Sequence, residues 1–345
     1  MNRRRRFYRH ALPRLGLLLA LAIFAGTWSL AAHAQDAASV DDRPATQSDE
    51  PRFTSIRVGF SDHYKTAHWT PVEFTIAGGR EAVTVVLSVT LADGDGYPSI
   101  VTTPQPTLLL PDRSTRVQLD VEPGRVDGSF SAALVNVETG KTVARHQFES
   151  RYEADPMHPL MALASTEQLL VSLGPNIGLE TALRLQGTSS EVQSTVVASL
   201  ASIGELPSRW IAYDGVNSLV LATSDSALYR SLAEDSTQIE ALDRWVRLGG
   251  TLLICVGAQG AEILAPGAPL ARFAPGEFVE MVQLTNLAPL EEYAEDTTSP
   301  IIPPGTRRNA RSIDVPPLAN VKGAIEAQDG SDLPLVVRSS YGLGH

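Results

Sequence analysis

Cysteine is nearly absent from this sequence, since only Cys255 occurs among 345 residues. A single cysteine cannot form an internal disulfide, so a disulfide-stabilised scaffold is excluded.

Basic residues are scarce after the first 34 positions. Six of the 28 lysines and arginines lie there without an acidic residue, which leaves 28 − 6 = 22 basic against 39 acidic residues, a net charge of −17. Such an acidic chain repels phosphate backbones and anionic lipid head groups, so nucleic acid is not an expected partner.

Long hydrophobic runs are also missing, except near the N-terminus. Residues 1–34 join an arginine-rich start to the uncharged stretch Leu15–Leu30 and to Ala32-His33-Ala34. This pattern is typical of a secretory signal peptide cleaved between Ala34 and Gln35. Two alternatives stay open: retention of the 18-residue apolar run Leu15–Ala32 as a membrane anchor, and export by the twin-arginine rather than the general route. We expect an exported protein of the periplasm or cell envelope, free or membrane-anchored.

The remainder has a globular composition, with 43% hydrophobic and 19% charged residues. Residues 35–52, rich in Asp, Ser, Ala and Thr, are expected to form a flexible linker. In residues 53–152, short apolar and β-branched runs alternate with turn residues, which predicts an immunoglobulin-like β-sandwich. The seven expected strands are Ser55–Phe60, Val72–Ile76, Ala82–Leu91, Thr107–Leu110, Arg116–Val121, Ser129–Val137 and Thr142–Phe148.

Residues 165–345 change to alternating strand and helix patterns. They predict an α/β domain with a mostly parallel sheet covered on both faces. The amphipathic run Thr237–Leu248 predicts a helix that ends at Gly249-Gly250. Gln193–Leu200 fits either a strand or a helix. The other expected elements are a helix at Gly178–Leu185 and strands at Gln168–Leu173, Ser218–Ala222 and Thr251–Val256.

The C-terminal part of this domain is less regular. Residues 261–317 are rich in proline and predict an insertion that carries short strands, at about Phe278–Leu284. A later strand is expected at Leu333–Arg338, followed by a hairpin-like turn at Ser340–His345. A strand that lacks its partner is a poor natural terminus. We therefore expect the parent chain to continue past His345, where a further segment could anchor it to the membrane.

Four segments of the second domain together resemble a known fold. Tyr213-Asp214, Ser218–Ala222, Ile239–Gly250 and Leu252–Gly257 are similar to the class I glutamine amidotransferase-like fold, which has a flavodoxin-like sheet. More narrowly, the region resembles the degenerate amidotransferase-like domains of exported bacterial envelope proteins. In those proteins the domain often follows a β-sandwich and precedes a transmembrane helix. The resemblance covers roughly residues 165–345 and implies a binding or scaffolding role.

Cys255 is the candidate nucleophile. The run from Leu253 to Gln259 resembles the amidotransferase turn G-x-C-x-G-x-Q, in which backbone amides beside the cysteine form an oxyanion hole. Leu253 stands where the family has glycine. The family's later histidine and glutamate are also missing, since His345 is the only histidine after Cys255. A thiol without a base is mostly protonated at neutral pH, which favours an inert core cysteine.

The strand ends offer a second candidate site. In an open parallel sheet, the carboxyl ends of the strands meet at a crevice that commonly binds ligands. Small polar residues follow three of the expected strands, and they suit either a small polar ligand or ordinary turns. They are Gly174, Asn176, Thr223, Asp225, Gly257 and Gln259.

No metal or cofactor is expected. Asp93-Gly94-Asp95-Gly96 lacks the further acids of a calcium loop and predicts a hairpin turn. His63 and His68 lack the further ligands of a zinc site. The sequence therefore favours a non-catalytic envelope protein that binds another envelope protein. The alternatives are a thiol-dependent amidotransferase or hydrolase using Cys255, and a small-ligand binder at the strand ends.

Overall fold

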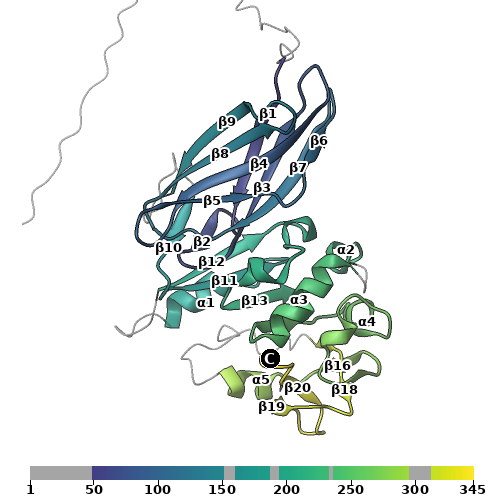
Figure 1. Cartoon of the computed structure of the whole chain (residues 1–345). Helices are drawn as coiled ribbons and strands as arrows, with labels where there is room; N and C mark the ends of the chain where they lie inside the picture. The colour runs from purple at the N-terminus through teal and green to yellow at the C-terminus, as the bar shows by residue number, and fades with distance from the viewer. Residues whose placement is uncertain (1–48, 151–159, 187–193, 233–235, 295–311) are drawn as a thin grey trace, which may run out of the picture. The chain divides into compact units, whose positions relative to one another are not determined.

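The computed structural model describes residues 49–150, 160–186, 194–232, 236–294 and 312–345. The expected signal peptide, its cleavage site at Ala34–Gln35 and most of the expected linker lie outside these ranges. The described chain has a β-rich, multidomain fold (Figure 1). An antiparallel β-sandwich occupies its N-terminal part, and a parallel sheet with short helices follows.

The sandwich consists of two antiparallel sheets. One has the order β1-β3-β7; in the other, β4 lies between β8-β9 on one side and β5 and β6 on the other. All seven expected strands are confirmed, and β5 was not predicted. The strands are β1 Arg52–Val58, β3 Thr70–Ala77, β4 Val83–Ala92, β5 Pro98–Thr102, β6 Thr107–Leu109, β7 Ser114–Val121, β8 Ser129–Asn136 and β9 Thr142–Glu149.

Strand alternation builds the sandwich core. Val72, Phe74 and Ile76 of β3 are fully buried, whereas Glu73 and Thr75 between them are half-buried. A period of two places alternate side chains on opposite faces of a strand, so one face of β3 packs inward. The inner faces of β4 and β8 complete the same cluster.

A small parallel pair joins the sandwich to the rest of the chain. Strand β2 (His63–Lys65) pairs with β10 (Met161–Leu163), which follows the sandwich in the sequence. Leu163 belongs to the core of the parallel sheet, whereas its neighbour Ala162 belongs to the core of the sandwich. Neither strand was predicted, because three residues are too few to show a period.

The sheet that follows the sandwich is entirely parallel, with the order β12-β11-β13-β14. Gln193–Leu200, which fitted two kinds of element, forms a strand. The strands are β11 Gln168–Leu173, β12 Thr195–Leu200, β13 Ser218–Ala222 and β14 Thr251–Cys255. The helical elements among and after them are α1 Leu179–Gln186, η1 Ile203–Glu205, η2 Trp210–Tyr213, α2 Ser226–Tyr229, α3 Thr237–Arg247 and α4 Gly260–Leu264.

Helix α3 has well-defined ends. The Ser236 hydroxyl accepts a hydrogen bond from the amide of Ile239 (3.2 Å), which is an N-cap. At the other end, the Gly249 amide donates to Val246 O and the Gly250 amide donates to Trp245 O. This bond pair is a Schellman motif, and it uses the positive φ of Gly249, +122°. The predicted end of the helix is confirmed.

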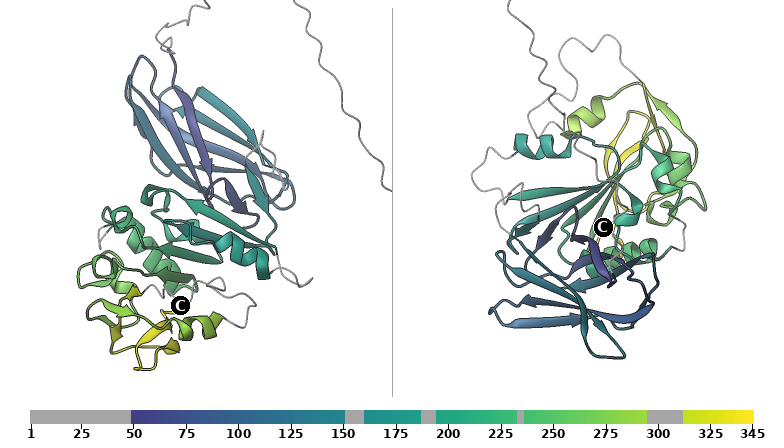
Figure 2. Two further views of the ribbon diagram at one scale, coloured as in Figure 1. Left: turned by 180° about the vertical axis from the view of Figure 1, so that it is seen from behind. Right: turned by 90° about the horizontal axis from the view of Figure 1, so that it is seen from above.

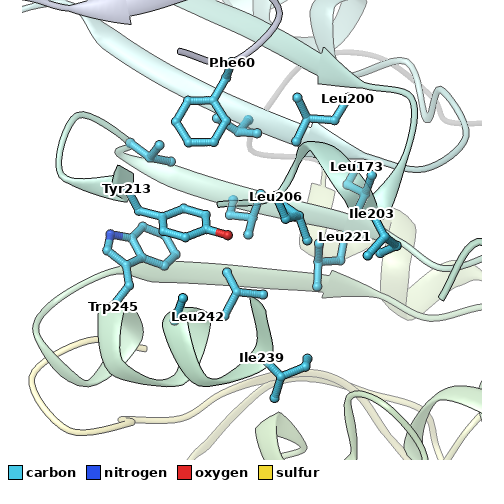
Figure 3. Packing of buried hydrophobic residues seen from close by; sticks show 14 of the residues in the cluster. Phe60, Leu173, Leu200, Ile203, Leu206, Tyr213, Leu221, Ile239, Leu242 and Trp245 are labelled. Atoms are coloured by element: carbon cyan, nitrogen blue, oxygen red, sulfur yellow. The ribbon is translucent and has the colours of Figure 1, made fainter. Parts of the chain in front are cut away.

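One face of the parallel sheet carries the main core. Tyr213 of η2 lies between Phe60 of the sandwich and Trp245 of α3, with ring centroids 5.8 and 5.5 Å away (Figure 3). These rings belong to the same cluster as Val171 and Leu219 of the sheet. Burial of aromatic side chains supplies much of the hydrophobic stabilisation of such a core.

The opposite face of the sheet is more open. Leu170, Val197 and Cys255 are only half-buried there, and the Leu253 side chain is 51% exposed. Val220, on the same face, is buried. Among the residues that the structure describes, full cover is therefore found over one face, whereas the sequence predicted it over both.

The C-terminal lobe consists of short antiparallel pairs (Figure 2). The short strands expected around Phe278–Leu284 are confirmed as β15 and β16, which pair with different strands, β18 and β17. The expectation that Leu333–Arg338 lacks its partner is wrong, since β20 pairs with the earlier strand β19. The elements are η3 Ala271–Phe273, β15 Glu277–Phe278, β16 Val282–Leu284, α5 Ala288–Ala294, β17 Ile313–Val315, β18 Leu318–Ala319, β19 Ala324–Gln328 and β20 Pro334–Arg338.

In the described ranges, we find no helix that is long and apolar enough to cross a membrane.

Candidate functional site

The strand-end crevice lies between β11 and β13. Strand β12 extends the sheet on one side of β11, and β13 and β14 extend it on the other, so the strand order changes direction here. Ligands commonly sit at such a position. In this chain Tyr229 of α2 fills it, because its hydroxyl lies 3.0 Å from Leu173 O and 3.1 Å from Ala222 O. These carbonyls belong to the last residues of β11 and β13.

Tyr229 is suited to a structural role. Its side chain is 1% exposed, and burial is the main reason that its pKa lies well above the usual value. The phenol therefore stays protonated and can donate a hydrogen bond near neutral pH. Sequence reasoning missed this residue. The only signal was its position, seven residues after the end of β13.

Two of the predicted site residues form the walls of the filled crevice. A Cβ at Gly174 would lie 2.2 Å from Ala222 O and 3.2 Å from the Tyr229 hydroxyl, and its φ is +110°. Glycine is required here so that the ends of the two strands can approach. Thr223 is fully buried, and its hydroxyl donates to Cys255 O at 3.1 Å.

The other predicted residues lie in the loops after the strands. Asn176 Oδ1 accepts from the Gly178 amide (2.7 Å), and Asp225 Oδ1 accepts from the Ala227 amide at the start of α2 (3.1 Å). Both bonds stay within one turn. Gln259 Oε1 accepts from the Ser226 amide at 2.6 Å, so it links the loop after β14 to the residue that follows Asp225. A Cβ at Gly257 would meet nothing within 4 Å.

A polar cluster absent from the prediction holds α2 against α4. The Ser226 hydroxyl donates to Glu262 Oε2 (2.7 Å), and Arg230 pairs with the same oxygen (3.2 Å). The hydrogen bond from Ser226, followed by that from Arg230, holds the pKa of Glu262 below its usual value. This cluster resembles part of a catalytic set, but Ser226 is 3% exposed and donates to a carboxylate rather than to a histidine.

Cys255 lies within a regular strand. It is the last residue of β14, and α4 begins only at Gly260, so no sharp strand-to-helix elbow forms at the thiol. Cys255 is not among the described residues with positive φ. A nucleophile elbow requires a strained turn at the nucleophile itself. The candidate turn seen in the sequence is therefore not present in the described geometry.

No described histidine lies beside the thiol. Burial raises its pKa above the usual value. His345 bonds to backbone atoms at the opposite end of β14, four residues away from Cys255. A strand rises about 3.3 Å per residue, so the separation is roughly 13 Å, which is too far for proton transfer.

The remaining described histidines lie in the sandwich. His63 Nδ1 is 2.6 Å from Ser61 O, and His68 Nδ1 is 2.9 Å from Thr66 O. His146 packs beside aromatic rings. Within the part of the chain that the structure describes, no group of three or more His, Cys, Asp or Glu residues is arranged to hold a metal ion.

The Asp93 turn uses its own carboxylate. Asp93 Oδ1 accepts hydrogen bonds from the amides of Asp95 (3.0 Å) and Tyr97 (2.8 Å). It connects the antiparallel pair β4 and β5, which confirms the predicted hairpin.

A shallow hollow lies where the sandwich meets the parallel sheet. Arg57, Glu73, Glu205 and Leu206 contribute to its lining. Two of its charged groups form an ion pair, since Arg57 bonds to Glu73 at 2.7 Å, and Glu205 accepts from the Ala201 amide at 3.2 Å.

Residues 54–151 match the model of a family described as a domain of unknown function (DUF8726). The match covers the sandwich and does not extend into the parallel sheet. No curated protein matches the chain.

Several solved structures are similar to parts of the chain. One is a β-glucuronidase from Bacteroides uniformis (10% identity, TM-score 0.26, 30% of this chain and 14% of that chain). Another is Spo0M, a sporulation control protein from Bacillus subtilis (12% identity, TM-score 0.22, 31% and 51%). A third is a Niemann-Pick type C2 protein from the Japanese carpenter ant (10% identity, TM-score 0.23, 30% and 94%). The chain spans less than two thirds of the first two, and likenesses with such TM-scores carry no functional weight.

Proposed function

We propose that this chain is an exported, non-catalytic protein of the cell envelope that acts as a binding or scaffolding module. In this proposal an immunoglobulin-like sandwich is followed by a degenerate class I glutamine amidotransferase-like domain with a flavodoxin-like sheet. The observation that carries it is the filled crevice. Tyr229 bonds to the last carbonyls of β11 and β13, where a ligand would sit in a related binding or catalytic fold.

The state of the thiol supports the same reading. Cys255 is half-buried within β14, burial raises its pKa, and its strand places it far from His345. Thiol catalysis needs a thiolate, which a neighbouring base or a lowered pKa must supply. Neither is found around Cys255 in the described residues.

The contacts between the sandwich and the parallel sheet suit a scaffold. The Trp69 amide donates to Asp214 (3.1 Å), and Lys65 Nζ donates to Asn217 (3.1 Å). Arg209 lies 2.7 Å from the buried Asp120 carboxylate, as an ion pair not aligned for a hydrogen bond. Burial raises the pKa of Asp120, which the nearby Arg209 partly offsets. These contacts join the sandwich to the parallel sheet, as a scaffolding role requires.

Selective thiol labelling tests the absence of thiol chemistry. The folded chain and the urea-unfolded chain are treated with iodoacetamide at neutral pH, and Cys255 is followed by mass spectrometry. We expect labelling of the folded chain to be slower by on the order of tenfold or more, because the buried thiol is protonated and shielded. Faster labelling of the folded chain would support the thiol-enzyme alternative and overturn the proposal.

Export is tested separately by the N-terminus of the protein recovered from cell fractions. We expect a periplasmic form that begins at Gln35. A membrane-bound form that retains residues 1–34 would support the anchored alternative. Recovery only from the cytoplasm would contradict the envelope location.

A further inference from the structure

The junction between the sandwich and the parallel sheet contains a buried carboxylate without a hydrogen bond. Asp120 of β7 is 3% exposed, and neither oxygen of its side chain has a hydrogen-bond partner among the described residues. Buried polar atoms are nearly always hydrogen-bonded, because a charge that leaves water without partners is costly. The position of this carboxylate therefore needs a physical explanation.

The sandwich itself offers little to this carboxylate. The residue opposite Asp120 on β3 is Pro71, and Gln118 lies two positions away on the same face of β7, so both neighbours are uncharged. Other charged side chains on this face pair with one another at 2.7 and 3.5 Å, and they are Arg57, Glu73 and Arg116. Within the described ranges, no cation of the sandwich lies within 4 Å of Asp120.

The cation that Asp120 does have comes from the other side of the junction. Arg209, the residue before η2, places Nη1 2.7 Å from Asp120 Oδ2. The contact is not aligned for a hydrogen bond. The two side chains also differ in their surroundings, since that of Arg209 is 60% exposed and that of Asp120 is 2% exposed. Such a contact depends on the charge of the buried partner, because little else holds the exposed one in place.

Other contacts hold the junction together without this pair. Phe60 of the sandwich packs against Tyr213 of η2, with ring centroids 5.8 Å apart (Figure 3). The Trp69 amide donates to Asp214 at 3.1 Å, and β2 pairs with β10. These contacts are apolar or involve backbone groups. The junction can therefore stay closed when Asp120 changes its charge.

We propose that Asp120 and Arg209 form a proton-operated latch between the sandwich and the parallel sheet. While Asp120 is ionised, its charge holds the Arg209 guanidinium at the junction. When Asp120 takes up a proton, this attraction is lost, and Arg209 turns toward solvent while the junction stays closed. The latch thus presents or withdraws one surface cation without unfolding the chain.

The electrostatics of Asp120 agree with this role. Burial raises its pKa, and the nearby Arg209 offsets only part of that rise. The unfolded-state pKa of an aspartate is about 3.9, so between the two values the folded chain holds a proton that the unfolded chain has lost. The ionised carboxylate therefore destabilises the fold at neutral pH, and stability rises as pH falls through the folded-state pKa.

NMR of the isotope-labelled full chain tests the latch. The chemical shift of Asp120 Cγ and the order parameter of Arg209 Nε are followed from neutral to acidic pH. We expect Asp120 to titrate above the ordinary aspartate value, and Arg209 Nε to lose order with the same midpoint. Titration of Asp120 at or below about pH 3.9, or an order parameter of Arg209 that does not change with pH, would overturn the proposal.

Two variants of Arg209 sharpen this experiment. Arg209→Gln removes the cation, so the midpoint of Asp120 should move to still higher pH. Arg209→Lys keeps the charge and should leave the midpoint closer to that of the wild type. Equal midpoints in the wild type and Arg209→Gln would mean that the two groups are not coupled, and would overturn the latch.

Urea unfolding gives an independent measurement. Asp120→Asn keeps the shape of the side chain but cannot take up a proton. As pH falls from neutral, we expect the urea midpoint of the wild type to rise relative to that of Asp120→Asn. Asp95→Asn, at an exposed turn residue, is the matched control and should follow the wild type. Other titratable groups of the junction cancel in this comparison, and they are His63, Lys65, His68 and Asp214.

The opposite trend in urea would contradict the latch. Midpoints of the wild type and Asp120→Asn that stay parallel with pH, or a wild type that loses more stability in acid, would overturn the proposal. None of these readouts depends on the reactivity of Cys255 or on export, so the latch and the proposed function are tested separately.

Discussion

The parallel sheet has two places where a partner could attach, and they differ in whether their backbone groups are already hydrogen-bonded within the chain. At the crevice between β11 and β13, the Tyr229 hydroxyl bonds to both terminal carbonyls. At the outer edge of β14, His345 bonds to the backbone beside Thr251, and no other described strand pairs with that side. The backbone of the crevice is satisfied within the chain, whereas the edge still has donors and acceptors to offer. The position at which open parallel sheets commonly bind ligands is therefore less accessible to a partner here than the edge of the sheet.

Tyr229→Ala should empty the crevice and cause the largest loss in the free energy of unfolding. Loss of a buried aromatic side chain costs about 3–5 kcal/mol, since it leaves a cavity. Tyr229→Phe keeps the ring and should cost only about 1 kcal/mol. Urea unfolding of the two variants measures the difference. Equal costs would mean that the ring does not fill the crevice.

Gly344→Ala should disturb the edge with a smaller effect. Its methyl group would meet Gly250 O and Val246 O at 2.2 and 2.3 Å, so the segment Ser340–His345 must move. Overpacking of this kind costs about 1–3 kcal/mol. Gly330→Ala should leave the free energy of unfolding almost unchanged. A loss in Gly330→Ala equal to that in Gly344→Ala would remove the basis for this comparison.

Thr223→Val should weaken the link between the end of β13, which borders the crevice, and the end of β14, which borders the outer edge. The Thr223 hydroxyl links the end of β13 to Cys255 O at the end of β14. The change keeps the shape and removes one hydrogen bond, which costs about 1 kcal/mol. Thr223→Ser, which retains the hydroxyl, should lose less. If Thr223→Ser loses more than Thr223→Val in urea unfolding, the methyl group rather than the hydroxyl is important.

The pH dependence of Cys255 should give the smallest effect. Because burial raises the folded-state pKa of the thiol, the folded chain retains a proton that the unfolded chain loses. The thiol's contribution is complete below the unfolded pKa of about 8.5 and is lost as pH rises through the folded value. Stability should thus fall more steeply above that pH in the wild type than in Cys255→Ala. Parallel curves between pH 7 and 10 would contradict the burial of the thiol.

Local patterns in the sequence predicted much of the fold. The run Gln168–Leu173 is a strand with those bounds, and Gly249-Gly250 ends α3, because apolar runs and glycine caps act over a few residues. The partner of β20 could not be predicted, since pairing between strands depends on distant segments. The pairing of β2 with β10 could not be predicted either, because neither strand is long enough to show a pattern.

The candidate site was harder to predict than the fold. The sequence places Gly174 and Thr223 at strand ends, as the structure does, but it does not show that the Tyr229 hydroxyl bonds to the last carbonyls of both strands. An aromatic residue on a helix of four residues has no periodic signature. For Cys255, the spacing resembled a catalytic turn, whereas the backbone continues as a strand. Motif spacing alone does not determine whether the chain bends.

The pairing of β2 with β10 has a consequence for the order of folding. The Thr66 hydroxyl bonds to Leu163 O, 97 positions later in the chain, so the base of the sandwich closes only after nearly all of its strands have been made. Contacts between such distant positions slow folding. A growing chain would leave Tyr64, which is 1% exposed in the finished fold, accessible until Met161–Leu163 arrives. Until then, the apolar residues at the base of the sandwich are exposed to any chaperone that holds extended chains.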